Sequence, residues 1–277
     1  MIDSKTSSGR INEVSDESGL QRNPGSIINS PLLSASGFRH AFFSRLGGAS
    51  QAPFESLNFS VTVGDDERAV ARNLARAGHY LGIDPDHILF CNQVHGIVCH
   101  QVTRHDDALD VRARHADAVM SSDPGVACSV RIADCGPLLV ADRTSGLVAA
   151  VHSGWRGTLQ NIAGTVISDM RKQIGRTLDL VAALGPHIES CCFEVGDEVA
   201  RDLVAASPDK DIVAPGKHDR PHIDLRRMIH AQLIEAGIAE RAIDHVRGCT
   251  YCRPEEFFSY RREGKRSGRH LAAIVAR

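Results

Sequence analysis

The chain has 277 residues, of which 42% are hydrophobic and 24% charged, the balance of a globular protein that can bury a substantial core. Its formal net charge of -2 argues against general nucleic-acid binding, which requires a concentrated positive field. No apolar run approaches the roughly 18 residues needed to cross a membrane, so we expect neither a nucleic acid nor a membrane as a partner.

Residues 1–30 are polar and rich in Ser, Asn and Gly. They lack the continuous apolar segment of about 7–15 residues that a secretory signal contains, so we expect a disordered tail followed by a single domain over residues 31–277. The eight cysteines are spread along the chain rather than concentrated as in a small disulfide-rich protein. We therefore expect reduced thiols and a cytoplasmic location.

Hydrophobic patterns after residue 31 predict both strands and helices. Apolar, β-branched runs bounded by Gly, Pro and Asp indicate strands, and apolar residues at helical spacing indicate helices, one of them capped by Asp224. In chain order these are a helix over 66–81, strands over 97–103, 125–132, 137–141 and 147–152, a helix over 158–174, a strand over 180–184, a helix over 224–236 and a strand over 271–276. Several strands follow one another directly, which favours an α+β domain with mixed β-sheets flanked by helices over a regular doubly wound fold.

Three short segments share one design, an apolar strand followed by a side chain that can bind a metal. They are "CNQVHG" with His95, "SVRIADCGP" with Cys135 and "AAVHSGWRG" with His152. One thiolate and two imidazoles suit Zn²⁺ well and Cu²⁺ tolerably. Three protein ligands would leave one coordination position open, as in catalytic zinc sites, where the pKa of a bound water falls to about 7.

Spacing alone does not establish this site. The three residues are 40 and 17 residues apart in sequence, so local structure does not hold them together, and a histidine in such a chain is more often structural than a metal ligand. The ordered motifs "NQVHG", "RIADCGPLLVAD", "VHSGWRG", "LGPHI", "FEVGDEV" and "FFSYRREGKRSGRHLA" resemble the YfiH family. Its members are known as multicopper polyphenol oxidases (laccases) or as purine nucleoside phosphorylases. The resemblance runs from "FFSRLGGAS" at 42–50 to residue 277 and implies a YfiH-like fold. It also implies that His95, Cys135 and His152 form the metal site.

Four further residues are candidates for substrate binding. Arg45 and Arg156 lie in glycine-rich turns, where a guanidinium and backbone N–H groups can bind phosphate, although either arginine could instead form a surface ion pair. The phosphorolysis that the resemblance implies favours the phosphate role for Arg45. Gln93 could orient a substrate or hold its own loop, and His187 could line the pocket or an ordinary turn.

Other motifs have simpler interpretations. Asp134 would point away from the metal, so we expect it to cap backbone groups or support a ligand. The CxxC pair Cys249 and Cys252 could be a redox dithiol or half a zinc site, but no second CxxC completes a four-cysteine set and the adjacent pair at 191–192 lacks zinc-knuckle spacing. We therefore favour buried structural thiols. The basic stretch 260–270 is interpreted as a solvated turn, with Arg261 or Arg262 facing the substrate.

The resemblance implies a zinc enzyme that acts on purine nucleosides and phosphate. The implied reactions are phosphorolysis of adenosine, inosine, guanosine and methylthioadenosine, and deamination of adenosine. One alternative is a copper polyphenol oxidase, and another is a hydrolase with Cys135 as nucleophile, acting on a peptidoglycan precursor. A third is a non-enzymatic metal domain in which His187 supplies a fourth ligand. The sequence leaves the preferred nucleoside, the bound metal and the oligomeric state open.

Overall fold

The computed structural model describes residues 27–214 and 220–277, and its strands form two large sheets and one small one. A five-stranded sheet has the order β1-β2-β13-β6-β3, a six-stranded sheet has the order β12-β9-β7-β8-β5-β4, and β10 pairs with β11. The strands are β1 (Ile27–Ile28), β2 (His40–Phe43), β3 (Ile88–Leu89), β4 (Cys99–Gln101), β5 (Ala118–Ser121), β6 (Ala127–Ile132), β7 (Gly136–Asp142), β8 (Val148–Ser153), β9 (Leu180–Leu184), β10 (Val213–Ala214), β11 (His222–Ile223), β12 (Ile243–His245) and β13 (His270–Val275).

Both large sheets mix parallel and antiparallel pairs. In the five-stranded sheet β13 runs antiparallel to β2 and β6, whereas β3 is parallel to β6. In the six-stranded sheet β7 runs antiparallel to β8 and β9, whereas β4 is parallel to β5 and β12 to β9. The predicted α+β architecture with mixed sheets is therefore confirmed.

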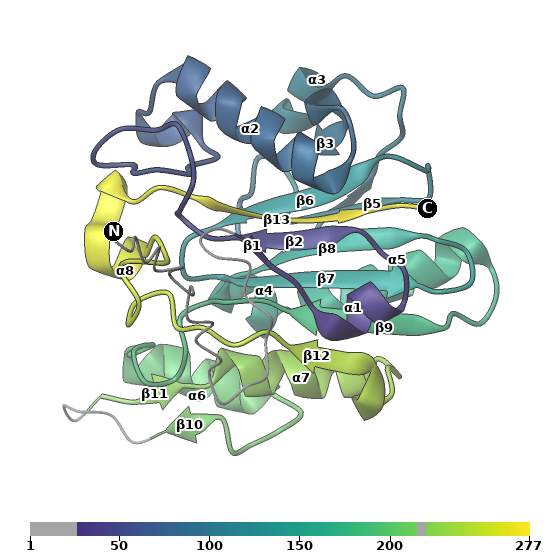
Figure 1. Ribbon diagram of the computed structural model, residues 1–277. Helices are drawn as coiled ribbons and strands as arrows, with labels where there is room; N and C mark the ends of the chain where they lie inside the picture. The colour runs from purple at the N-terminus through teal and green to yellow at the C-terminus, as the bar shows by residue number, and fades with distance from the viewer. Residues whose placement is uncertain (1–26, 215–219) are drawn as a thin grey trace, which may run out of the picture.

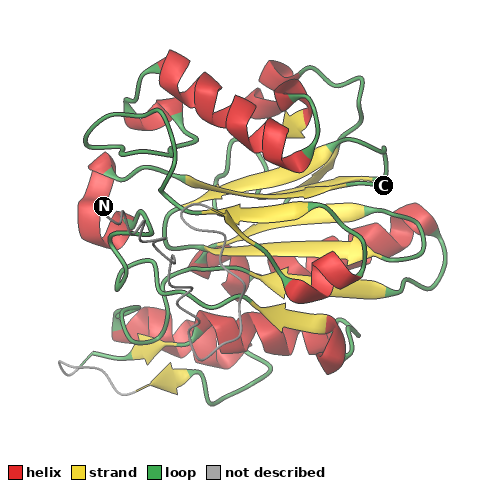
Figure 2. Ribbon diagram, in the orientation of Figure 1, coloured by secondary structure: helices red, strands yellow, loops and turns green. Residues whose placement is uncertain are grey.

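The longest helices lie on the outer faces of the two sheets, which gives four layers (Figures 1 and 2). The helices are α1 (Pro31–Ala35), α2 (Glu67–Leu81), α3 (Ala108–Ala113), α4 (Trp155–Leu159), α5 (Ile162–Ile174), α6 (Asp197–Ala206), α7 (Leu225–Glu235) and α8 (Tyr260–Glu263). Helix α2 packs on the outer face of the five-stranded sheet, and α5 and α7 pack on the outer face of the six-stranded sheet. The strands β6, β7, β8, β9 and β13 supply the apolar layer between the sheets.

Strand β7 shows why its sequence is apolar throughout. Successive side chains of a strand point to opposite faces, and both faces of β7 are covered. Leu139 and Ala141 therefore join the layer between the sheets, while Leu138 and Val140 pack against α5 and α7. All four are fully buried, so a polar substitution at any of them would leave an unsatisfied group in a core.

The predicted helices are confirmed at 66–81 and 224–236, and their ends follow from capping. Asp66 accepts a hydrogen bond from Ala69 N–H, and Gly82 ends α2 in the left-handed conformation (φ 65°). Asp224 accepts from Arg227 N–H at the start of α7, as predicted.

Two sequence-based boundaries are corrected. The stripe over 158–174 is not one helix but two, because Asn161 adopts a left-handed conformation (φ 59°) and its side chain accepts from Gly164 N–H to start α5. Leu159 belongs to the first of the two helices. It packs against a separate apolar cluster near α6, although its spacing also fits the apolar stripe of α5. Residues 27–30, placed in the tail, instead form β1 and the cap of α1; residues 1–26 lie outside the described residues.

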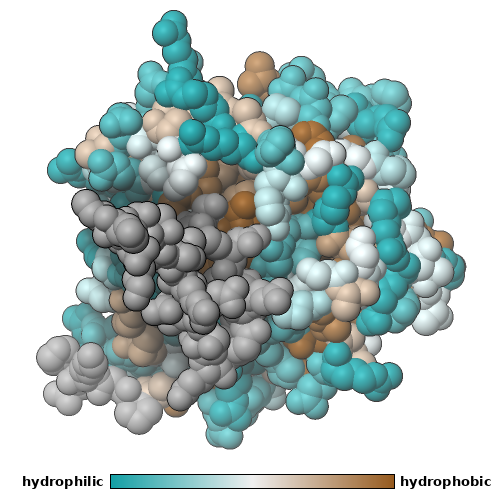
Figure 3. Space-filling view, in the orientation of Figure 1, coloured by the Kyte–Doolittle hydropathy of each residue, from teal (hydrophilic) through white to brown (hydrophobic). Residues whose placement is uncertain are grey.

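The face of the molecule drawn in Figure 3 is mostly hydrophilic, with small separate apolar areas among its described residues. None of the helices in the described ranges is both long and apolar enough to pass through a membrane.

Candidate metal centre

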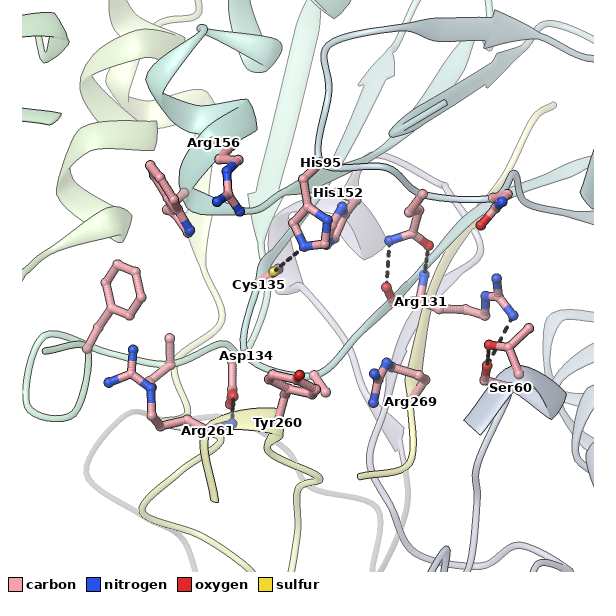
Figure 4. A pocket seen from close by; sticks show the side chains of 17 residues that line it. Ser60, His95, Arg131, Asp134, Cys135, His152, Arg156, Tyr260, Arg261 and Arg269 are labelled. Carbon is pink, nitrogen blue, oxygen red and sulfur yellow. Dashed lines mark hydrogen bonds between the residues drawn. The ribbon is translucent and has the colours of Figure 1, made fainter. Parts of the chain in front are cut away.

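The three predicted metal ligands come together at one end of the six-stranded sheet (Figure 4). His152 lies in β8, Cys135 immediately precedes the adjacent strand β7, and His95 lies in the loop between β3 and β4. Their ligand atoms all lie within 4.8 Å of one another, and Cys135 Sγ is 3.9 Å from His95 Nε2. The predicted convergence of these side chains is confirmed.

Asp117, a residue that the sequence did not single out, holds two of the three side chains in place. Its buried carboxylate accepts a hydrogen bond from His152 Nδ1 at 2.7 Å, which leaves His152 Nε2 for a metal. It also accepts from the backbone N–H groups of Val94 (3.2 Å), His95 (2.9 Å) and Gly96 (2.6 Å). His95 has φ 62°, so this carboxylate stabilises a loop conformation that is unfavourable for a non-glycine residue.

Gly154 allows the ligands to approach one another. A Cβ at this position would lie 2.9 Å from His95 Cδ2 and 3.1 Å from Cys135 Sγ. The backbone of Gly154 has φ -74°, which any residue can adopt. The glycine of the "HSGW" motif is therefore required for space rather than for backbone freedom.

The charges at the site favour a thiolate. Burial raises the pKa of the Cys135 thiol, but the neighbouring His152 and His95 rings outweigh it and lower the pKa to about 6. Burial lowers the pKa of His152, but Cys135 and Asp117 outweigh it and raise the pKa to about 9. Burial also raises the pKa of Asp117, and its hydrogen bonds with His152 and the loop N–H groups bring it below the ordinary value. A thiolate can bind a metal or act as a nucleophile.

The ligand triad faces a cavity of about 630 Å³, within the range of about 300–1,000 Å³ typical of small-molecule sites. Aromatic side chains on its wall are Trp155, Phe193 and Tyr260, and arginine side chains are Arg131, Arg156, Arg261 and Arg269. In Figure 4 Arg156 and Arg269 extend toward the space beside the triad from different sides. The cavity thus combines metal donors, cationic groups and flat apolar surfaces.

Of the four substrate-binding candidates, Arg156 and Gln93 line the cavity. The Arg156 guanidinium lies 4.3 Å from the ring centroid of Trp155 and makes no hydrogen bond or ion pair within the described part of the chain. The amide of Gln93 is occupied, because it donates to Arg131 C=O (2.7 Å) and accepts from Arg131 N–H (2.8 Å). Gln93 therefore holds its own loop against β6, the second of the two roles considered.

Arg45, which was expected to bind phosphate, lies outside the cavity. Arg45 is not among the cavity residues, since its guanidinium donates to the carbonyl oxygens of Glu55 and Pro254 and pairs with Glu263 at 3.3 Å. These contacts join the segment after β2 to the loop that contains Pro254 and to α8. Glycine-rich turns accommodate such packing as readily as a bound anion.

His187 does not line the cavity either. It is fully buried, its Nδ1 lies 2.9 Å from Gly185 O and 3.1 Å from Arg226 Nη2, and burial together with Arg226 lowers its pKa to about 4. It is absent from the donor group of His95, Cys135 and His152, so it does not supply a fourth ligand there.

The stretch 260–270 is a wall of the cavity rather than a solvated turn. Tyr260, Arg261 and Arg269 line the cavity, whereas Arg262 donates to the carbonyl oxygens of Thr250 and Tyr251. Asp134 supports this wall as expected of a capping residue. Its carboxylate accepts from Arg261 N–H (2.7 Å) and Thr250 Oγ1 (2.6 Å).

The CxxC motif is not a pair of buried thiols. Cys249 is buried but Cys252 is exposed, and the Sγ atoms of both lie near those of Cys191 and Cys192. The preference for buried structural thiols is therefore wrong for Cys252. The lack of a second CxxC did not exclude a four-cysteine set, because an adjacent pair about 60 residues earlier completes it.

Several residues in or behind the site escaped the sequence analysis because their local signals were weak. Trp155 and Tyr260 stand inside motifs that were quoted for their histidines or charges. Asp117 could have been found from the sequence. It directly precedes the apolar run 118–120, and a carboxylate buried there needs hydrogen-bond partners, so its position indicates a functional or structural role. Arg131 and Arg269 had none, because their positions depend on how the strands align.

Comparison with known proteins gives consistent results. A family model described as multi-copper polyphenol oxidoreductase laccase matches residues 39–277. The chain is 34% identical over 243 residues to the purine nucleoside phosphorylase YlmD of Geobacillus stearothermophilus, covering 83% of this chain and 87% of that protein. It is 35% identical over 237 residues to adenosine deaminase RL5 from an unknown prokaryotic organism, covering 80% and 87%. The crystal structure of YlmD from Geobacillus stearothermophilus has a TM-score of 0.85 and 30% identity, and covers 93% of this chain and 98% of that chain. The expected YfiH-like fold is confirmed.

Proposed function

This chain belongs to the multi-copper polyphenol oxidoreductase laccase family, and from that premise we propose that it processes purine nucleosides in the cavity beside His95, Cys135 and His152. The first reaction proposed is phosphorolysis. A phosphate oxygen forms a bond to C1′ of the ribose, the bond from C1′ to N9 breaks, and the purine leaves with the electron pair and takes up a proton. The products are the free base and ribose 1-phosphate.

The observation that carries this proposal is the set of arginines beside the donor triad. Arg156 contacts the Trp155 ring but has no hydrogen-bond or ion-pair partner among the described residues, and Arg269 is anchored through Nη1 to the carbonyl oxygens of Ser267 and Gly268. The remaining N–H groups of Arg269 are thus available to a ligand on a fixed side chain. Two guanidiniums suit a phosphate dianion because each can donate two parallel hydrogen bonds. Positioning and charge stabilisation can supply most of the rate enhancement of such a reaction.

The purine is assigned to the aromatic part of the cavity. Trp155, Phe193 and Tyr260 offer faces or edges on which a flat base can stack, and such contacts contribute about 1–3 kcal/mol per base. These side chains do not restrict the base to adenine. We therefore include adenosine, inosine, guanosine and methylthioadenosine as substrates.

The donor set fits Zn²⁺. A sulfur and two imidazole nitrogens within 4.8 Å of one another can close on an ion with bonds of about 2.0–2.3 Å after small side-chain movements. His95, Cys135 and His152 would hold the ion, which as a Lewis acid would lower the pKa of coordinated water and polarise a substrate oxygen. Among the described residues no fourth His, Cys, Asp or Glu joins this group, so the protein would leave a coordination position of the ion open.

Deamination of adenosine is a second reaction proposed for the same cavity, and the similarity to adenosine deaminase RL5 favours it. Water adds at C6 of the purine and ammonia leaves, which gives inosine. Phosphate takes no part, so the arginines would matter less than for phosphorolysis. The two reactions are therefore separable by substitution.

The polyphenol oxidase alternative has less support in the donor groups. Reduction of O₂ to water by a multicopper enzyme requires several copper ions close together. In the described part of the chain, the groups of three or more metal donors are the triad and the four-cysteine cluster, and only the triad contains histidine. The proposal also places the protein in the cytoplasm, where its eight cysteines would stay reduced.

The test is a steady-state assay of purified full-length protein with inosine and phosphate. We expect hypoxanthine and ribose 1-phosphate in equal amounts, loss of both in His95→Ala, and no change in the control His79→Ala, which alters an exposed residue of α2. In Arg269→Met we expect a raised KM for phosphate, with Arg72→Gln on the exposed face of α2 as control. Equal hypoxanthine from wild type and His95→Ala would refute the proposal.

A further inference from the structure

We propose that Cys191, Cys192, Cys249 and Cys252 bind one Zn²⁺ in a closed, four-thiolate structural site that fixes one wall of the cavity. The proposal concerns a different group of residues from the triad and does not depend on which nucleoside reaction the protein catalyses.

The positions of the four sulfur atoms match such a site. All four Sγ atoms lie within 4.8 Å of one another, with 3.2 Å between Cys192 and Cys252 and 3.7 Å between Cys191 and Cys252. Tetrahedral zinc with Zn–S bonds of about 2.3 Å places its sulfurs about 3.8 Å apart. Shifts of a few tenths of an ångström to an ångström would therefore complete the tetrahedron.

Backbone hydrogen bonds bring the two cysteine pairs together. Cys192 N–H and Phe193 N–H both donate to Glu189 C=O (2.9 and 3.0 Å), which forms the turn that presents the adjacent pair. The second segment lies alongside, because His187 N–H donates to Gly248 C=O and Thr250 N–H donates to His187 C=O (both 3.1 Å). Backbone hydrogen bonds thus hold the segments that carry the four donors side by side.

The surroundings suit a closed site. Arg262, which pairs with Glu263, donates to the carbonyl oxygens of Thr250 and Tyr251 and so holds the two residues between the cysteines of the CxxC motif in place. Cys249 is buried while Cys191 and Cys252 are exposed, so an ion can enter from solvent and reach a sulfur in the interior. Four cysteine ligands leave no position open for a substrate, which indicates a structural role.

The cluster is connected to the cavity on both sides. Phe193, directly after Cys192, lines the cavity. Thr250, within the CxxC motif, donates to Asp134, which also accepts from Arg261 N–H at the start of α8. An ion that links the two segments would therefore hold Phe193 and Arg261 in fixed positions while leaving the triad untouched.

The experiment measures zinc per chain in full-length protein purified under reducing conditions with zinc supplied. We expect two equivalents in wild type, one in Cys252→Ser, one in His95→Ala and none in the double variant; Cys99→Ser, a partly buried cysteine outside both groups, should keep two. Replacement of zinc by Co²⁺ should give much stronger sulfur-to-cobalt absorption in His95→Ala than in Cys252→Ser. One equivalent in wild type, all of it lost in His95→Ala, would overturn the proposal.

A second measurement needs no substitution and so applies even if Cys252→Ser does not fold. Native zinc-loaded protein is treated with iodoacetamide and the modified cysteines are located by mass spectrometry. Cys191 and Cys252 should be protected although both are exposed, and a strong chelator should expose them to the reagent. Rapid alkylation of the zinc-loaded protein, or a disulfide between Cys192 and Cys252 in protein purified with reductant, would overturn the assignment.

Discussion

Replacing Asp117 with asparagine is expected to weaken metal binding at the triad by about 10–100-fold while leaving the chain folded. The side chains have nearly the same shape, so the substitution changes hydrogen bonding and charge rather than packing. Asp117 contacts neither the cavity nor the metal position, and it acts through the orientation of His152 and the loop that carries His95.

The magnitude follows from the four hydrogen bonds of the carboxylate. One oxygen accepts from His152 Nδ1 (2.7 Å) and His95 N–H (2.9 Å), and the other accepts from Gly96 N–H (2.6 Å) and Val94 N–H (3.2 Å). Asparagine keeps one oxygen and turns an NH₂ toward the other two donors, so two bonds are lost. At about 1.5 kcal/mol for each bond to a charged group, the free energy of unfolding falls by about 3 kcal/mol. A typical domain stability of about 5–15 kcal/mol tolerates that loss.

Zinc affinity is measured by competition with a chromophoric chelator. Zinc that wild type binds and His95→Ala does not bind is assigned to the triad. Urea unfolding of the same variants gives their stability. The matched control is Asp106→Asn, whose carboxylate accepts from Thr103 and Arg114 outside the cavity, so it should lower stability without changing zinc affinity. If Asp117→Asn binds zinc as tightly as wild type while its stability falls, the orienting role is refuted.

Gly154→Ala should also lower zinc affinity, because its Cβ would meet His95 Cδ2 at 2.9 Å, and equal affinity would show that the loop can move aside. Iodoacetamide should modify Cys135 slowly in zinc-loaded protein and quickly after chelation, as judged by mass spectrometry; fast modification with zinc present would favour the thiol hydrolase instead. His270 tests the pH dependence of stability. Burial lowers its pKa from 6.5 to about 3, so between these values the unfolded chain binds a proton that the folded chain does not, and the free energy of unfolding falls as pH decreases, by up to about 1.4 kcal/mol per pH unit. His270→Gln should show a shallower fall between pH 7 and pH 5 in urea unfolding, and parallel curves would contradict this reasoning.

Local sequence patterns predicted much of the secondary structure, and the family resemblance implied the metal triad. The runs at 125–132, 137–141 and 147–152 are largely apolar because most of their residues are covered on both faces of the sheet, and that burial leaves a signal along the whole strand. Short elements left no such signal. Strands β3, β5 and β12 contain two to four residues, too few for a period to appear.

Residue types and ordered motifs by themselves determined the mixed fold and which three side chains could share a metal. Tertiary structure alone decided the partners of those side chains: Asp117 lies 35 residues from His152 in sequence, and the two cysteine pairs are about 60 residues apart. Tertiary structure also places Arg45 outside the cavity and Arg269 in its wall. The physical reason is that a strand's own residues encode its burial, whereas a hydrogen bond or a metal ligand set depends on the register of neighbouring strands and the path of the loops between them.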